Sequence, residues 1–128
     1  MEVLKILGQA NPAATTVTQL YTVPIDKGCV VSFLFISNIG GTNETVRVAV
    51  INGHIPETGI ENKSYVLYDY SLSAGTFFQT LKGCTLAQGD TIAVYASSAD
   101  IAFSLFGSEF DQTYEYDETI PYGYGYGY

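Results

Sequence analysis

Residues able to carry acid–base chemistry are few in this chain of 128 residues. His54 is the sole histidine, and Glu57 follows it three positions later in a stretch rich in turn residues. A His–Glu pair acts as a general base only beside a nucleophile and within a pocket. We therefore interpret His54 as a loop or subunit-contact residue, with a site shared by several copies at an oligomer axis as the alternative. No catalytic residue is predicted.

The acidic residues raise the question of a calcium site. Calcium takes six to eight oxygen ligands, so several carboxylates close in sequence are its expected signature. Such density is found at Glu115, Asp117 and Glu118, where the acids alternate with Tyr or Thr rather than with Asn and Gly. A solvated acidic segment, or a contact with basic groups on a partner, is the preferred interpretation. We predict neither a metal nor another cofactor.

Other chemical motifs are weak. Cys29 and Cys84 are the two cysteines; without a recognisable secretion signal we expect free buried thiols, with a disulfide as the alternative. Gly40-Gly41 precedes a predicted strand rather than a helix, so it does not resemble a phosphate-binding loop. No serine lies in a nucleophile-elbow sequence.

Charge and hydropathy limit the classes of partner. The net charge is -8, and charged residues make up only 14%, against roughly 25% in typical soluble proteins. No basic patch is available to neutralise phosphates, so nucleic-acid binding is not expected, and an acidic surface is repelled by anionic lipids. The longest apolar run, Cys29–Ile36, is far shorter than the ~20 residues of a membrane-spanning helix. Low charge suits a protein whose surfaces are covered by partners.

Short β-forming runs separated by turn residues dominate the first 108 positions. In the run 44–51, Val46, Val48 and Val50 share the better core face, whereas 29–38 is apolar nearly throughout, as in a central strand covered on both sides. The pattern predicts an all-β fold, an antiparallel β-sandwich or jelly-roll-like domain of about eight strands over residues 1–108. The predicted strands are 3–9, 15–23, 29–38, 44–51, 64–70, 76–81, 91–96 and 101–106.

The last twenty residues, 109–128, differ sharply in composition. They hold six of the eleven tyrosines and five of the thirteen acids, with no Lys or Arg. Such a segment has too little aliphatic surface to form its own core, so alone it would be disordered. We therefore expect an extended C-terminal arm that lies against its own domain or against a neighbouring subunit.

Tyrosine alternates with glycine at the end of this arm. In an extended chain, alternate side chains lie on one face about 6.6–6.8 Å apart, and Tyr supplies a large contact area at modest entropic cost. We predict packing on a neighbouring subunit, with the arm's own domain or a glycan as alternatives. The predicted interface residues are Tyr114, Tyr116, Tyr122, Tyr124, Tyr126 and Tyr128, with Glu115, Asp117 and Glu118 as contacts to a basic partner.

Three stretches carry a resemblance to a known group of proteins. They are Lys5–Pro24 (KILGQANPAATTVTQLYTVP), Val30–Val50 (VVSFLFISNIGGTNETVRVAV) and Gly89–Glu109 (GDTIAVYASSADIAFSLFGSE). Over residues 4–109 the chain resembles small β-rich virion structural proteins of tailed phages, especially phages of cyanobacteria and other marine bacteria. The resemblance implies a particle component without catalytic residues, either a capsid decoration (cement) protein or a tail, baseplate or fibre module.

Capsid decoration is the favoured location, because a single domain with an arm can reach across neighbouring subunits. The resemblance and this function imply a closed homo-oligomer, with a trimer favoured. They also imply a second virion protein as partner, such as the major capsid protein, and a place in the virion after assembly in the host cytoplasm. The alternatives from other classes are a carbohydrate-binding adhesin and an extracellular filament subunit.

Overall fold

The computed structural model of the chain describes residues 3–112. Within this range it has nine strands, a short 3-10 helix and no α-helix, which confirms the predicted all-β class. The strands are β1 (Val3–Ala10), β2 (Thr18–Thr22), β3 (Lys27–Asn38), β4 (Glu44–Ile51), β5 (Tyr65–Leu72), β6 (Phe77–Thr80), β7 (Cys84–Leu86), β8 (Thr91–Ala96) and β9 (Ile101–Asp111).

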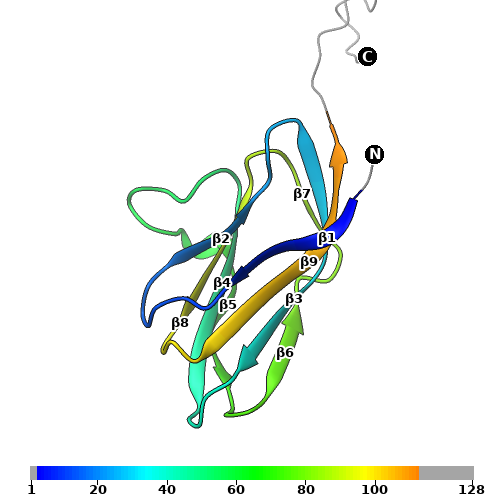
Figure 1. Cartoon of the computed structure of the whole chain (residues 1–128). Coiled ribbons are helices and arrows are strands. Elements are labelled where there is room, and N and C mark those ends of the chain that lie inside the picture. The colour runs from blue at the N-terminus through cyan, green and yellow to red at the C-terminus, as the bar shows by residue number, and fades with distance from the viewer. Residues whose placement is uncertain (1–2, 113–128) are drawn as a thin grey trace, which may run out of the picture.

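The strands form two antiparallel sheets that pack as a sandwich (Figure 1). Sheet A has the order β1-β9-β3-β6, with β7 paired to β3, and sheet B has the order β2-β8-β4-β5. With β7 set aside, the eight remaining strands pair first with last, second with seventh, third with sixth and fourth with fifth. This nested pairing, divided between two sheets, is the jelly-roll arrangement.

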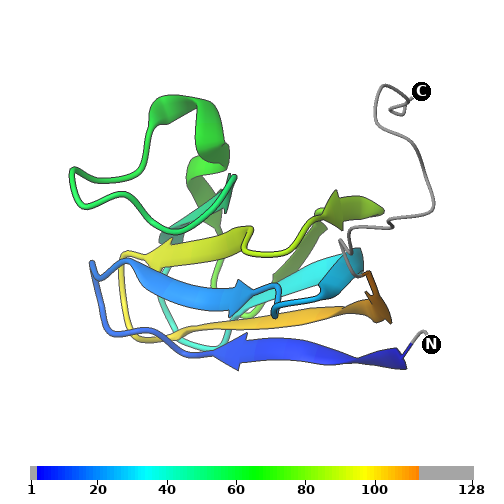
Figure 2. The same cartoon turned by 90° about the horizontal axis from the view of Figure 1, so that it is seen from above.

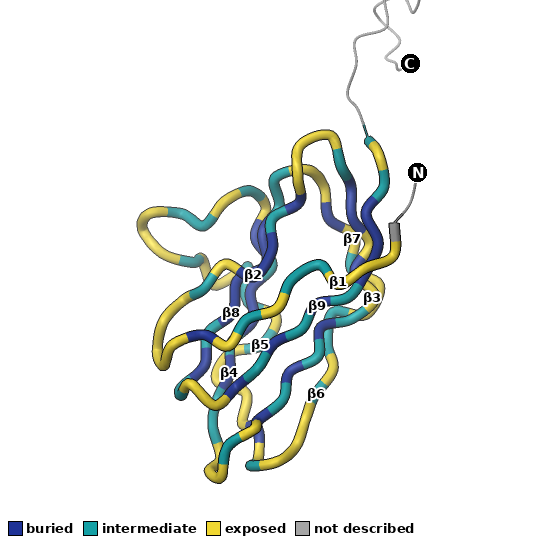
Figure 3. Tube along the Cα trace, viewed as in Figure 1, coloured by how far each residue is buried: buried dark blue, intermediate teal, exposed yellow. Residues whose placement is uncertain are grey.

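One hydrophobic core lies between the two sheets. Leu34 of β3 and Phe103 of β9 are almost fully buried, and along β9 buried positions alternate with less buried ones (Figure 3). From sheet B, Val46 and Val48 are fully buried in the same cluster and Val50 is half-buried against it. The predicted core face of this strand is therefore confirmed.

One prediction about β3 is wrong. The strand lies inside sheet A, but only one of its faces is buried: Val31 and Leu34 belong to the core, whereas Val30 and Ser32 are exposed. Its apolar composition predicts a strand covered on both sides. In the described part of the chain, however, no element covers the outer face of sheet A, so half of this apolar surface meets solvent.

Two further differences concern the number and length of strands. β7 adds a ninth strand to the eight predicted, because its three residues are too few to show a period-two pattern. β9 runs on to Asp111, past the predicted domain boundary at 108. The division into a domain and an arm stays a prediction, since most of residues 109–128 lie outside the described range.

The long loop between β4 and β5 carries the 3-10 helix η1 (Asn62–Ser64) and projects from the sandwich (Figure 2). Its Ile55 and Ile60 pack against Ala49, Ile51 and Ala93. These small and aliphatic side chains point away from the main core, because they alternate with the inward-facing valines of β4. The loop thus covers part of the outer face of sheet B.

Candidate interaction site

The predicted interface residues fall outside the described residues. This holds for Tyr114, Glu115, Tyr116, Asp117, Glu118, Tyr122, Tyr124, Tyr126 and Tyr128. The structure does describe the end of β9, from which the C-terminal segment with these residues continues. We call the end of the sandwich around Glu109, Asp111 and Gln112 the root of the arm.

At the root, β9 is paired with β1 as far as Glu109 and with β3 as far as Asp111. Asp111 is the ladder partner of Lys27 in β3. One residue later, the Gln112 amide donates a hydrogen bond of 2.9 Å to the carbonyl oxygen of Asp26, in the turn that precedes β3. The chain therefore leaves the sandwich from a fixed position.

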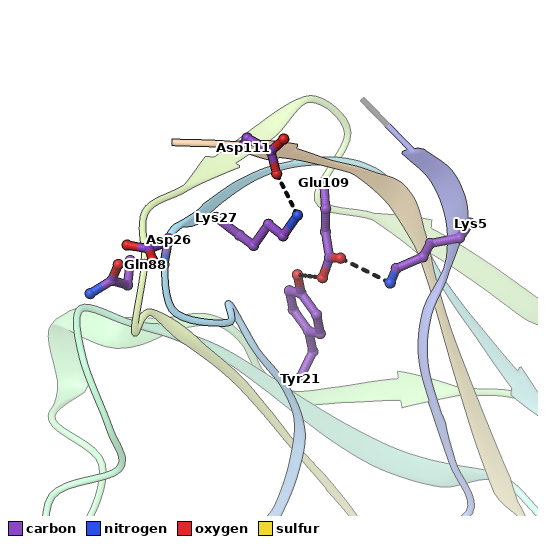
Figure 4. A network of polar contacts seen from close by, with 7 residues as sticks. All are labelled: Lys5, Tyr21, Asp26, Lys27, Gln88, Glu109 and Asp111. Carbon is purple, nitrogen blue, oxygen red and sulfur yellow. Dashed lines mark hydrogen bonds and ion pairs between the residues drawn. The ribbon is translucent and has the colours of Figure 1, made fainter. Parts of the chain in front are cut away.

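A buried carboxylate lies at the centre of the root (Figure 4). Glu109 is only 7% exposed. Its Oε2 accepts a hydrogen bond of 2.5 Å from the Tyr21 hydroxyl, and its Oε1 lies 2.9 Å from Nζ of Lys5. Tyr21 is buried beside Leu20 at a bulge in β2. The contacts join three strands and link sheet B to sheet A.

These partners set the ionisation of the root. Burial by itself raises the pKa of Glu109, but the hydrogen bonds from Lys5 and Tyr21 outweigh it and hold that pKa below the ordinary value. Burial and the hydrogen bond to Glu109 raise the pKa of Tyr21 above its usual value. Near neutral pH the carboxyl is therefore ionised and the phenol protonated. Neither group is poised to exchange a proton, so the network has the character of an anchor.

A second, exposed pair lies beside it. Nζ of Lys27 is 2.5 Å from Oδ1 of Asp111, and this hydrogen bond raises the pKa of Lys27 and lowers that of Asp111. In the adjoining turn the Asp26 amide donates to Oε1 of Gln88 at 2.7 Å (Figure 4). Exposed ion pairs contribute little to stability. Their role here is to orient the last residues of β9.

Glu109→Gln should lower the free energy of unfolding by about 2 kcal/mol at pH 7, because hydrogen bonds to a buried charged group are lost or weakened. The folded pKa of Glu109 is below the unfolded value near 4.5. Its contribution is therefore present above pH 4.5 and is lost as the pH falls through the folded pKa. Urea denaturation at pH 7 and pH 3 should show a difference between wild type and variant that shrinks at pH 3.

The exposed loop variant Glu57→Gln is the control for this experiment. It should change the unfolding free energy by less than about 0.5 kcal/mol at either pH. A Glu109→Gln protein as stable as the wild type at pH 7 would show that the network does not anchor the root.

Next to the root, the outer face of sheet A exposes apolar side chains. Leu4 is 79% exposed, Ile6 53% and Phe77 62%, and the rings of Phe33 and Phe106 lie 4.9 Å apart on the same side of the sheet. Apolar patches of this kind are uncommon on soluble monomers and indicate an interaction surface. We call this surface the aromatic face and define it as Leu4, Ile6, Phe33, Phe35, Phe77 and Phe106.

The outer face of sheet B is more polar. The guanidinium carbon of Arg47 lies 4.2 Å and 4.3 Å from the ring centroids of Tyr68 and Tyr95, and its Nε donates to Oδ1 of Asp69 at 2.6 Å. Asp69 has a φ of 51°, an uncommon value for a residue other than glycine. The cation, the carboxylate and the rings satisfy one another, so this face presents a self-contained cluster.

The histidine and the cysteines of the described residues do not come together in a catalytic or metal site. His54 is exposed in the loop after β4, where the sequence predicts a loop residue. Cys29 and Cys84 are free thiols, and burial raises the pKa of both, which keeps them protonated and unreactive. Between residues 3 and 112, no group of three or more His, Cys, Asp or Glu is arranged to hold a metal ion. No helix in that range is long and apolar enough to span a membrane.

Sequence reasoning missed both the anchor and the aromatic face. Glu109 falls within the acidic segment by composition, yet it continues the alternation of β9 and is buried. That alternation was the available signal. Phe33 and Phe35 belong to the apolar run that predicts a strand covered on both faces. The sequence of this run does not show which of its two faces is exposed to solvent.

No known protein family matches the chain, and no curated protein matches it either. Among solved structures, it resembles one of the infectious bursal disease virus Gx strain, with 16% identity and a TM-score of 0.49 over 85% of this chain. It also resembles a structure of Bacillus endospore appendages that form disulfide-linked pili, with 15% identity and a TM-score of 0.43 over 88% of this chain and 87% of that one. The chain spans only 30% of the length of the bursal disease virus chain. At TM-scores below 0.5, these distant likenesses add nothing to the assignment of fold or function, and the resemblance to tailed-phage proteins stays a prediction.

Proposed function

We propose that the chain is a non-enzymatic structural protein of a tailed-phage virion, and specifically a capsid decoration protein. In this role it stabilises the shell through association of its β domains and through the C-terminal arm. The proposed partners are other copies of the chain, with a trimer favoured, and a second virion protein such as the major capsid protein. The proposed location is the virion, after assembly in the host cytoplasm.

The observation that carries this proposal is the exposed aromatic face on an otherwise well-packed jelly roll. Leu4 and Phe77 lie at opposite edges of sheet A, and both are more than half exposed. Leaving such side chains in water is unfavourable, by about 25 cal/mol for each Å² of apolar area that a partner would cover. The face therefore favours a protein that works in contact with others.

The fold and the chemistry of the described residues agree with a structural role. Jelly rolls recur in viral capsid domains, although they also occur in lectins and cupins, so this support is by analogy. At the root, the pKa of Glu109 is lowered and that of Tyr21 is raised, so both shifts are away from neutral pH. These two groups hold the end of β9 and are not suited to act as a general acid or base.

Immunogold electron microscopy tests this function directly. An antibody raised against the purified full chain is applied to virus particles from cultures that carry the sequence, with pre-immune serum as the control. Gold on the icosahedral shell is the expected result. Gold confined to tails or fibres would replace decoration with the tail-module function, whereas gold on cell-surface filaments, or on no particle, would overturn the virion assignment.

A further inference from the structure

The aromatic face forms one stripe across sheet A. Ile6, Phe106 and Phe33 are aligned by the register of β1, β9 and β3. Phe33 contacts Phe106 at 4.9 Å between ring centroids, and Phe35, two residues along the same strand, stacks on Phe77 of β6 at 4.9 Å. The stripe therefore runs from β1 at one edge of the sheet to β6 at the other.

At its β1 end the stripe is hollowed into a shallow groove of about 440 Å³, lined in part by Leu4, Ile6, Phe33 and Phe106. Lys5 is the one charged residue in this lining, and its ammonium group pairs with Glu109. A ligand for the groove must therefore bring apolar or aromatic surface rather than charge.

We propose that this face is the docking surface for Pro121–Tyr128 of a neighbouring copy. The inference rests on the proposed function and deepens it, because it names the surface that the arm covers. Four tyrosine rings on one side of an extended chain span roughly 20 Å, and the distance from β1 to β6 across three strand spacings is roughly 14 Å. The row of rings is thus long enough to cover the whole stripe.

The contact area that the four tyrosines offer approaches that of a stable interface. A tyrosine side chain buries roughly 150 Å² or more, so four bury at least roughly 600 Å². Stable interfaces cover about 800 Å² on each partner. The glycines between the tyrosines have no side chain, so the arm can approach the sheet closely. An arm of this composition therefore supplies most of an interface by itself.

The direction of β9 favours a neighbouring copy over the arm's own domain. The strand points away from the sandwich at Asp111 (Figure 1). Of the residue types that dominate turns, the eight residues 113–120 contain one, Asp117, and no Gly, Pro, Asn or Ser. Within the described residues, both lysines at the root are paired with carboxylates of β9, Lys5 with Glu109 and Lys27 with Asp111.

Sheet B is the weaker candidate. Its exposed Tyr68 lies against Arg47, whose charge is already paired with Asp69. Covering this cluster would remove charged groups from water, which costs free energy that an apolar face does not impose. The loop with η1 also occupies part of that side.

Photo-crosslinking of the full chain tests the docking surface. Tyr124→p-benzoyl-phenylalanine is introduced into ¹⁵N-labelled protein, which is mixed with an excess of unlabelled wild type and irradiated. Mass spectrometry should find residue 124 joined to unlabelled peptides from β1, β3, β6 or β9. Three outcomes would each overturn the proposal: crosslinks within labelled chains alone, crosslinks to β5 or β8, or a chain that stays monomeric. None of them would affect the immunogold result.

Surface variants give a second readout of the same proposal. The double variant Ile6→Ser, Phe77→Ser should weaken self-association at least about tenfold in sedimentation velocity, because both side chains lie on the stripe. Tyr68→Ser is the matched control: Tyr68 is 58% exposed, close to the exposure of Phe77, but lies in sheet B. It should change the association constant by no more than about twofold. Equal effects of the two changes would overturn the assignment.

Discussion

Deleting Pro121–Tyr128 should leave the β domain folded and weaken self-association by about 100-fold or more. Aromatic anchors at the centre of an interface typically contribute 1–2 kcal/mol or more each, and about 2.8 kcal/mol corresponds to 100-fold in affinity. The core between the sheets is complete without this segment, since Leu34, Val46, Phe103 and the rest of the buried cluster come from residues 20–105. Sedimentation velocity measures the association, and circular dichroism checks the fold.

A full-length control separates the rings from the length of the arm. Changing Tyr122, Tyr124, Tyr126 and Tyr128 to Ser keeps the chain length and should weaken association as much as the deletion does. A truncated protein that assembles with unchanged affinity and heat resistance would show that the arm is not an interface element. The decoration role would then have to rest on the aromatic face alone.

Phe103→Ala should lower the free energy of unfolding by about 3–5 kcal/mol, because removing a large buried ring loses both transfer free energy and packing around the cavity. Phe103 is 1% exposed near the start of β9. The loss is a large part of the roughly 5–15 kcal/mol that stabilises a typical domain. Chemical denaturation measures it, and Phe103→Leu, expected to cost about 1 kcal/mol, serves if the alanine variant does not fold.

Phe77→Ala is the matched control, with the same chemical change on the outer face of the same sheet. Phe77 is 62% exposed, so its removal should cost about 1 kcal/mol or less in stability. The two variants should therefore separate folding from association: Phe103 stabilises the domain, and Phe77 contributes to the docking surface. Equal losses of stability would contradict the division of sheet A into a core face and an interaction face.

The Tyr21–Glu109 contact would resist a pulling force on the segment that follows β9. Tension on the arm would act on β9, which lies between β1 and β3 in sheet A and is joined to sheet B through Tyr21 and Glu109. From Glu109 inward, β9 is paired with a strand on each side, so a pulling force would be shared by both neighbours. This arrangement agrees with the proposed role of the C-terminal segment as an interface element.

The local pattern of the sequence was enough to identify eight of the nine strands in the described residues. The predicted bounds of β4 and β8 coincide with those observed, Glu44–Ile51 and Thr91–Ala96. Strand period and turn residues are properties of neighbouring residues, so they can be read without knowing the fold. The composition of residues 109–128 predicts a segment that cannot form a core of its own. The structure places its first three residues in β9, and residues 113–128 lie outside the described range.

The tertiary structure alone decided which residues meet and which faces stay open. Ile6 lies beside Phe106 only because β1 pairs with β9, and Tyr21 reaches Glu109 only because a bulge in β2 turns it inward. Both contacts join residues far apart in the chain, and no local preference encodes them. For the same reason, the apolar run of β3 could not reveal that one of its faces is left uncovered. The sequence determined most of the strands, and the pairing of distant strands decided where the Glu109 network and the uncovered aromatic face lie.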